Sequence, residues 1–251
     1  LRLINVSVDV PGNNIGAIAG TLNENGIINN CSVESGLVKG YLYVGGLVGY
    51  AANCDINNSS NKATVNGVYG SRTPFSTGGI TGSLIAANIR NCYNAGEIIS
   101  NGGSTAGGIN GGGYTHVIEN CYNVGLVHGD GAWSLGAISG NQAAEGEGKW
   151  LENKGAGGPE ADKMTEAQMK ADAFVSNLNS WVDGNTGYFN WAMDTENING
   201  GYPVLIPWSY EARLNGITYS IDGGQTVSIP NFDKDIKSYI VTLPCNKPNA
   251  A

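Results

Sequence analysis

The chain has 251 residues and a formal net charge of −8, with 13 Lys and Arg against 21 Asp and Glu. This acidic balance argues against nucleic acids and anionic membranes as partners. No apolar run approaches the ~18 residues of a membrane-spanning helix, so membrane insertion is not expected. The opening LRLINVSVDV has no Met and already alternates apolar and polar residues, which indicates a piece excised from a longer chain.

A Gly-rich tetrad recurs along the first part of the chain. Its last glycine falls at Gly20, Gly49, Gly82, Gly111 and Gly140, at intervals of 29, 33, 29 and 29 residues. The extra residues fall around GSRTPFST, which indicates a loop insertion. After each of the first four tetrads comes a second signature, INNCSV, INNSSN, IRNCYN or IENCYN, and then a third apolar run such as GLVKG or GLVHG.

Each repeat thus holds three short runs that are too short for helices and are separated by Gly and Asn turns. Such a unit can bury its apolar face only by stacking on copies of itself. The pattern predicts a mainly β protein, a right-handed parallel β-helix of about five coils of about 29 residues with three faces per coil. We assign residues 1–155 to this solenoid.

Two aligned columns follow from the register. Asn30, Asn58, Asn91 and Asn120 fall at a turn, where Asn tolerates the left-handed conformation and stacked amides can hydrogen-bond along the axis. The next column holds small side chains, Cys31, Ser59, Cys92 and Cys121, which we expect to stack in the core without disulfides. The chain has five Cys in all and no C-x-x-C pair, so neither a disulfide framework nor structural zinc is expected.

The segments GGLVG, GGITG and GGING, each followed by a segment of the I-x-N-C-Y-N type, resemble the GLUG motif repeat. This resemblance covers roughly residues 1–155. GLUG repeats occur in large bacterial surface proteins, including adhesins and IgA-protease-type proteins, where they lie outside the catalytic domain. The resemblance implies a secreted protein of the bacterial cell surface, with further domains in the same polypeptide.

Residues 156–210 are predicted to close the solenoid. MTEAQMKADAFVSNLNS reads as one helix with Thr165 as N-cap, a capping box with Gln168, and an apolar face of Ala167, Ala171, Phe174 and Leu178. We expect this helix to pack over the last coil and Tyr202–Leu205 to add a closing strand, with Pro203 where no ladder donor is needed. In residues 211–251 a Gly-Gly turn precedes FDKDIKSYIV, and SYIVTLP alternates in the manner of a strand. This segment resembles the opening strands of a cadherin-like, Ig-like bacterial β-sandwich, although a full sandwich needs ~100 residues.

No catalytic, cofactor or metal site is expected. The two His, His116 and His128, flank one segment and we place them on different faces. The acids of residues 16–140 are scattered, apart from a loose pairing of Glu34 with Glu97, whereas glycosidic cleavage needs cooperating carboxylates in one cleft. The acids that cluster together lie later, near Trp150: Glu145, Glu147, Glu152, Glu160 and Asp162.

Four aromatic residues share repeat positions, Phe75 with Trp133 and Tyr93 with Tyr122. Exposed, they could stack on a sugar or anchor a host partner; buried, they would be packing at the coil corners. The sequence therefore favours a non-catalytic structural or adhesive module, with a glycan-binding or polysaccharide-degrading β-helix (a lyase or hydrolase) as the alternative.

Overall fold

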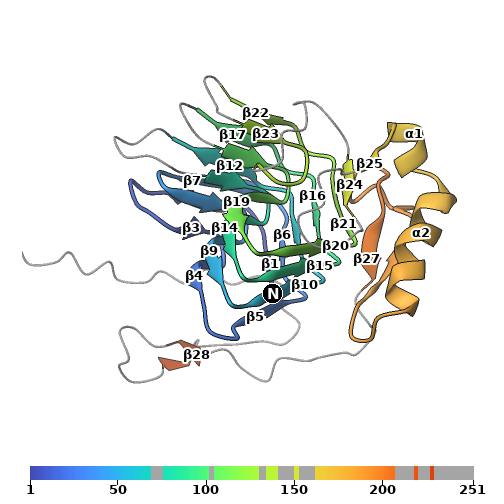
Figure 1. The fold of residues 1–251 in the computed structure, drawn as a ribbon, viewed down its shortest axis with the longest axis horizontal. Coiled ribbons are helices and arrows are strands. Elements are labelled where there is room, and N and C mark those ends of the chain that lie inside the picture. Colours follow the sequence, from blue (N-terminus) through green and yellow to red (C-terminus); the bar gives the residue numbers. More distant parts are fainter. Residues whose placement is uncertain are drawn as a thin grey trace, which may run out of the picture. The chain divides into compact units, whose positions relative to one another are not determined.

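The computed structural model describes residues 1–68, 76–101, 105–129, 134–140, 150–152, 162–206, 218–219 and 227–228. The chain divides into two compact units, Leu1–Trp208 and Ser209–Ala251. The first unit is a stack of short parallel strands with two helices against its side (Figure 1). Its longest parallel columns hold five strands, so the chain makes about four turns, and the predicted parallel β-solenoid is confirmed.

Each coil has five short strands instead of the three expected. The second coil, for example, consists of β6 (Ser32–Val33), β7 (Gly36–Gly40), β8 (Tyr43–Gly45), β9 (Val48–Ala52) and β10 (Asp55–Asn57). Two of the segments that read as single runs contain a corner. The Gly-rich tetrad separates β8 from β9, and the Asn-Cys step separates each INN-type strand from the next one.

Five sheets result. The sheet that faces the helices, here called the flank sheet, contains β1 (Arg2–Leu3), β6, β11 (Ser60–Asn61), β16 (Tyr93–Asn94) and β21 (Cys121–Asn123). The sheet before it in each coil contains β5 (Ile27–Asn29), β10, β15 (Asn88–Arg90) and β20 (Val117–Glu119). The sheet after it contains β2 (Val6–Asp9), β7, β12 (Thr64–Gly67), β17 (Ile98–Ser100) and β22 (Val127–His128).

The remaining two sheets lie on either side of the tetrad corner. One contains β3 (Ile15–Gly16), β8, β13 (Ser76–Gly78), β18 (Thr105–Gly107) and β23 (Ser134–Gly136). The other contains β4 (Ala19–Leu22), β9, β14 (Thr81–Ile85) and β19 (Asn110–Tyr114). The register pairs Val48 with Thr81 and Thr81 with Asn110, so the tetrads align as predicted.

Identical or similar apolar side chains repeat at each inward position. Ile56 pairs with Ile28 and Ile89, and Ile89 pairs with Ile118, all of them buried. Val65 lies between Val38 and Ile98 in the same way. Burying an aliphatic side chain contributes about 1.5–3 kcal/mol, so each added coil stabilises the coil beneath it.

The predicted Asn turn is present at all four positions. Asn30, Asn58, Asn91 and Asn120 have φ between 48° and 55°, in the left-handed region. The amide of Asn120 donates to Asn91 Oδ1 at 2.7 Å, and that of Asn91 donates to Asn58 Oδ1 at 2.8 Å. The amide of Asn58 continues the ladder to Asn29 Oδ1. We call these four residues the Asn corner.

A second asparagine ladder inside the coils was not anticipated. Asn61 donates to Asn94 Oδ1 and Asn94 to Asn123 Oδ1, both at 2.8 Å, and all three side chains are fully buried. Each amide also donates to the carbonyl two residues later, as Asn61 does to Ala63. These bonds satisfy polar groups whose burial would otherwise be costly.

The tetrad glycines are needed where coils and ladders approach closely. A Cβ on Gly46 would lie 2.5 Å from Cγ of Asn61, and one on Gly111 would lie 2.5 Å from the backbone of Thr77. Both distances are far below van der Waals contact, so a larger residue would push the backbones apart.

The small-residue column is also confirmed. The N–H of Cys31 points to Ser59 Oγ, that of Ser59 to Cys92 Sγ and that of Cys92 to Cys121 Sγ, at 3.2–3.4 Å. Cys92 and Cys121 are fully buried and Cys31 is partly exposed. These three residues and the buried Cys54 are free thiols, whereas Cys245 lies outside the described residues.

The segment after the solenoid differs from the expected single helix. α1 (Glu166–Met169) begins with the predicted capping box of Thr165 and Gln168, but it ends at Met169 with Lys170 as its C-cap, and α2 (Asp172–Asp183) follows. The buried residues are Met169, Phe174, Leu178 and Val182, so the face is shifted from the expected Ala167 and Ala171. In place of a strand at Tyr202–Leu205, β26 (Asn190–Ala192) pairs antiparallel with β27 (Val204–Ile206), and Pro203 precedes the strand.

We call residues 164–206 the flank segment, because they run along the side of the solenoid instead of over the last coil (Figure 1). Their apolar residues pack on Tyr93 and Tyr122 of the flank sheet. The Asn corner fixes their position, since Asn58 donates to the Gly187 carbonyl and Asn120 to the Leu178 carbonyl. The helix lies there because stacked tyrosines give the flank sheet an apolar outer face.

The last coil is followed by a reversal of chain direction. β24 (Trp150–Glu152) pairs with β21 in the antiparallel direction, and β25 (Asp162–Lys163) pairs antiparallel with β24. An antiparallel strand cannot continue the parallel coil. The solenoid's flank sheet therefore ends in this hairpin.

In the second unit, the described residues are β28 (Thr218–Tyr219) and β29 (Val227–Ser228), which pair antiparallel. The SYIVTLP segment and the remainder of residues 211–251 lie outside the described residues. No helix within the described ranges is long and apolar enough to cross a membrane.

Replacement of Asn91 by Ala tests the Asn corner. The fully buried Asn91 donates to Asn58 and to the Phe189 carbonyl, and its Oδ1 accepts from Asn120 and from the Trp191 indole. Leaving buried partners unpaired costs about 1–3 kcal/mol per group, so we expect Asn91→Ala to lose at least about 3 kcal/mol of unfolding free energy in urea.

The matched control is Asn197→Ala, at an exposed residue with the same φ of 55°. Its cost should be limited to about 1–2 kcal/mol for Ala in the left-handed region. Equal losses in the two variants would contradict a special role for the corner amide.

Alkylation of the native protein tests the cysteine column. Burial, and secondarily the charge of Asp55, raises the pKa of the Cys54 thiol to about 11, so at pH 8 neither this thiol nor the buried Cys92 and Cys121 should react with iodoacetamide. Cys31 should react first. Peptide mapping without reductant would contradict the column if it found disulfide-linked peptides or equal alkylation of all four residues.

Candidate functional site

A groove of about 510 Å³ opens on the flank sheet beside the flank segment. Its floor comes from the first three strands of that sheet and from the Asn corner, and its far wall from the β26–β27 side of the flank segment. The lining residues are Leu1, Arg2, Asn30, Cys31, Ser32, Glu34, Asn58, Ser60, Lys62, Tyr93, Ile198, Val204 and Leu205.

The groove exists because one outward column of the flank sheet changes character along the axis. Ser32 pairs with Ser60, Ser60 with Tyr93, and Tyr93 with Tyr122. The tyrosines fill the space beneath the flank segment, whereas the two serines leave it open. The adjacent outward column changes in the same way, from Glu34 and Lys62 to the small apolar residues that follow.

The groove carries one carboxylate and two cations. Glu34 Oε2 lies 2.5 Å from Lys62 Nζ, and its Oε1 lies 3.2 Å from Arg2 Nε. Lys62 also donates to the Ile198 carbonyl of the flank segment at 3.2 Å. Burial alone would raise the pKa of Glu34, but hydrogen bonds from Lys62 and Ser32 and the two positive charges hold it below its ordinary value of 4.5.

The two members of the Glu34–Lys62 pair are largely covered, with side-chain exposures of 15% and 14%, whereas the Arg2 side chain is 59% exposed. The covered pair therefore anchors the flank segment to the solenoid. Arg2 offers its guanidinium to the solvent at the edge of the groove.

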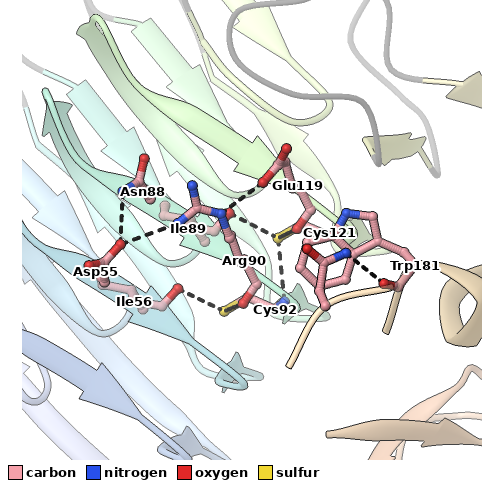
Figure 2. A network of polar contacts seen from close by, with 10 residues as sticks. Asp55, Ile56, Asn88, Ile89, Arg90, Cys92, Glu119, Cys121 and Trp181 are labelled. Atoms are coloured by element: carbon pink, nitrogen blue, oxygen red, sulfur yellow. Dashed lines mark hydrogen bonds and ion pairs between the residues drawn. The ribbon is translucent and has the colours of Figure 1, made fainter. Parts of the chain in front are cut away.

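A second polar network lies on the sheet of β10, β15 and β20, which precedes the flank sheet in each coil (Figure 2). Arg90 Nε lies 2.7 Å from Glu119, its Nη1 lies 3.3 Å from Asp55, and Asn88 donates to Asp55 at 2.8 Å. Burial opposes the charge of Arg90, but the hydrogen bond and charge of Glu119, with the charge of Asp55, raise its pKa. The network joins three successive coils on one face of the solenoid.

The structure places Tyr93 and Tyr122 in the core beneath the flank segment. Their rings stack with centroids 5.3 Å apart and an interplanar angle of 6°, and Trp191 and Phe174 cover them. Tyr122 is fully buried and its hydroxyl donates to the Pro203 carbonyl. Tyr93 is 5% exposed where it lines the end of the groove, and Tyr122 is fully buried, so both rings are placed as packing, one of the two alternatives that the sequence left open.

The other two aromatic candidates, Phe75 and Trp133, lie outside the described residues. The side chains of Glu145, Glu147, Glu152, Glu160 and Asp162 do as well.

The loose pairing of Glu34 with Glu97 is not present. Val33 is in register with Asn61 and Asn94, whereas Ile98 is in register with Val65 and Val38. Glu34 directly follows Val33 and Glu97 directly precedes Ile98, so the two acids lie in different columns. Glu97 instead lies 3.0 Å from His128 Nε2.

His116 is buried and immediately precedes β20, whereas His128 lies in β22, and burial lowers the pKa of His116. Within the ranges that the structure describes, no group of three or more His, Cys, Asp and Glu side chains is placed to hold a metal ion.

Sequence reasoning missed Arg2, Lys62 and Leu205. The signal that could have located the groove is the change from Ser-Asn to Tyr-Asn within one repeat column, from SSN at residues 59–61 to CYN at residues 92–94.

Replacement of Glu34 by Gln tests the anchoring pair. The folded-state pKa of Glu34 is depressed, so its stabilisation is present above pH 4.5 and is lost as the pH falls through the folded-state value. We expect Glu34→Gln to lower the unfolding free energy by about 1–3 kcal/mol at pH 7 and by less at pH 3. Asp9→Asn, which removes the exposed partner of Lys39, should change stability by less than about 1 kcal/mol.

Similar losses for both variants, or a Glu34→Gln effect that is the same at the two pH values, would show that the groove carboxylate contributes no more than a surface ion pair.

Comparison with known proteins gives two partial matches. Residues 40–66, from the last residue of β7 into β12, match the family described as "The GLUG motif". The immunoglobulin A1 protease of Streptococcus sanguinis is 39% identical over 74 residues, which is 30% of this chain and 4% of the relative's length. The chain therefore spans a small fraction of that curated relative. No solved structure matches. Residues 40–66 thus carry a GLUG motif within a β-solenoid of repeated coils.

Proposed function

We propose that the chain is a non-catalytic structural or adhesive module of a secreted protein of the bacterial cell surface. The GLUG motif and the partial similarity to a bacterial immunoglobulin A1 protease support an extracellular location. The relative's name refers to an antibody, and antibodies are extracellular proteins. The rest of the proposal comes from the chemistry of the solenoid.

The observation that carries the proposal is the pairing of the solenoid's acids. Glycosidic cleavage needs two carboxylates in one cleft, one of them free to exchange a proton. In the groove the lining carboxylate is Glu34, and Lys62 and Arg2 hold it in its charged form. Asp55 and Glu119 share a face, but Arg90 lies between them and binds both.

A structural role suits the stack itself. Each coil extends the axis by about 4.8 Å, the spacing of paired strands, and the buried ladders give every coil the same interior. Such a rod can hold other domains of a polypeptide at a distance and present one face along its length. We place the cell-surface ligand, a host protein or a glycan, on the flank side, and we place further domains on the same polypeptide.

The test is an activity screen of the full chain. Polysaccharide panels are assayed for new reducing ends and for unsaturated products, at pH 5 and pH 8. We expect no turnover by the wild type. Turnover that disappears in Glu34→Gln or Glu119→Gln, or in Glu147→Gln or Glu152→Gln, would overturn the non-catalytic proposal and favour the polysaccharide-degrading alternative.

A further inference from the structure

The flank segment has a free strand edge. The backbone N–H and C=O of Trp191 in β26 bond to the side chain of Asn179, with N–O distances of 2.8 and 3.0 Å. Trp191 is paired with Leu205, but its backbone N–H and C=O are bonded to Asn179 and not to Leu205. The two residues therefore form a non-hydrogen-bonded pair of the antiparallel ladder. In such a pair the N–H and C=O of Leu205 point away from β26. Among the described residues Leu205 has no hydrogen-bond partner on that side.

This free edge borders the groove. Val204 and Leu205 line it, opposite Ser32 and Ser60 of the flank sheet. A volume of about 510 Å³ is within the range of pockets that hold a ligand of several residues. An extended peptide laid along β27 could exchange two backbone hydrogen bonds with Leu205, while alternate side chains point to the groove floor.

The charge of the groove indicates which kind of ligand side chain it would bind. Its two cations exceed its one carboxylate, although the chain as a whole has a net charge of −8. Lys62 is committed to Glu34 and the Ile198 carbonyl, whereas most of the Arg2 side chain is exposed. A carboxylate on the ligand would pair with Arg2, because guanidinium presents several donors to one carboxylate.

We propose that this groove binds an extended peptide segment that carries an acidic side chain, by addition of a strand to the Leu205 edge of β27. The inference rests on the proposed adhesive function and names its ligand class and site. A protein segment suits the site better than a sugar, because the tyrosine at the end of the groove is stacked on Tyr122 and covered by Trp191. A sugar would therefore lack an exposed aromatic face.

Two-dimensional NMR of the full chain with millimolar peptide tests the proposal. The probe is acetyl-Thr-Val-Glu-Val-Thr-amide, and the readout is the shift of the Leu205 and Ile206 amide signals. A set of probes, each N-methylated at one residue, is compared with it. Strand addition predicts that N-methylation at the one residue whose N–H bonds to the Leu205 carbonyl abolishes the shifts, while N-methylation at the two residues beside it leaves binding intact. Loss at every position, or at none, would overturn the proposed geometry.

A second comparison tests whether Arg2 recognises the acidic side chain of the peptide. Arg2→Gln should weaken binding of the Glu probe by about two- to fivefold, as expected for a solvent-exposed ion pair, and should not change binding of the same peptide with Gln in place of Glu. Lys39→Gln, on another sheet, should leave both affinities unchanged. Equal effects of Arg2→Gln on the two probes would contradict the proposed preference for an acidic side chain.

An oligosaccharide panel in the same assay separates the two kinds of failure. Shifts of the groove signals with a sugar and none with the peptides would overturn this inference and leave the adhesive function standing. Turnover of a sugar would overturn the adhesive function itself.

Discussion

The left-handed turn at the Asn corner is the constraint on which the first unit depends. A left-handed residue at the same place in each coil bends the chain between two sheets, and Asn accepts this conformation at low cost. Its amide then bonds to the coil below. The remaining oxygen and hydrogen atoms reach the flank segment, as the bonds of Asn91 to Phe189 and Trp191 show. One side chain thus sets the bend, the coil register and the position of the segment that covers the flank.

The repeated motif gains a physical meaning from the coil interior. The last Asn of the second, third and fourth signature segments (Asn61, Asn94 and Asn123) is buried and points across the coil to the first glycine of the tetrad. Glycine is required there because a Cβ on Gly46 would collide with the amide of Asn61. The tetrad and the signature are therefore two halves of one contact. This explains why they recur together at a spacing of about one coil.

Much of the stack was predictable from the sequence because stacking gives equivalent positions in successive coils the same environment. The spacing of the tetrads predicted the register, and the columns at Asn91 and Cys92 predicted the left-handed turn and the buried thiols. The number of faces was not predictable, because a two-residue corner leaves no mark in a run of small apolar residues. The flank segment was misplaced because its docking depends on Tyr93 and Tyr122, and an aromatic pair in a repeat column reads equally well as exposed or covered. The groove needed the structure, since Arg2, Lys62 and Leu205 come from distant parts of the chain.

Native-state hydrogen exchange tests most directly the claim that the Asn corner joins stack and flank into one unit. Amide exchange is followed by mass spectrometry in increasing, sub-denaturing urea. If the corner bonds couple the two parts, α2 and β26 should open with the same free energy as β11, β16 and β21, in one cooperative step. If α2 and β26 exchange in an earlier, separate step while the flank sheet stays protected, the flank segment is an independent cover and the account is contradicted.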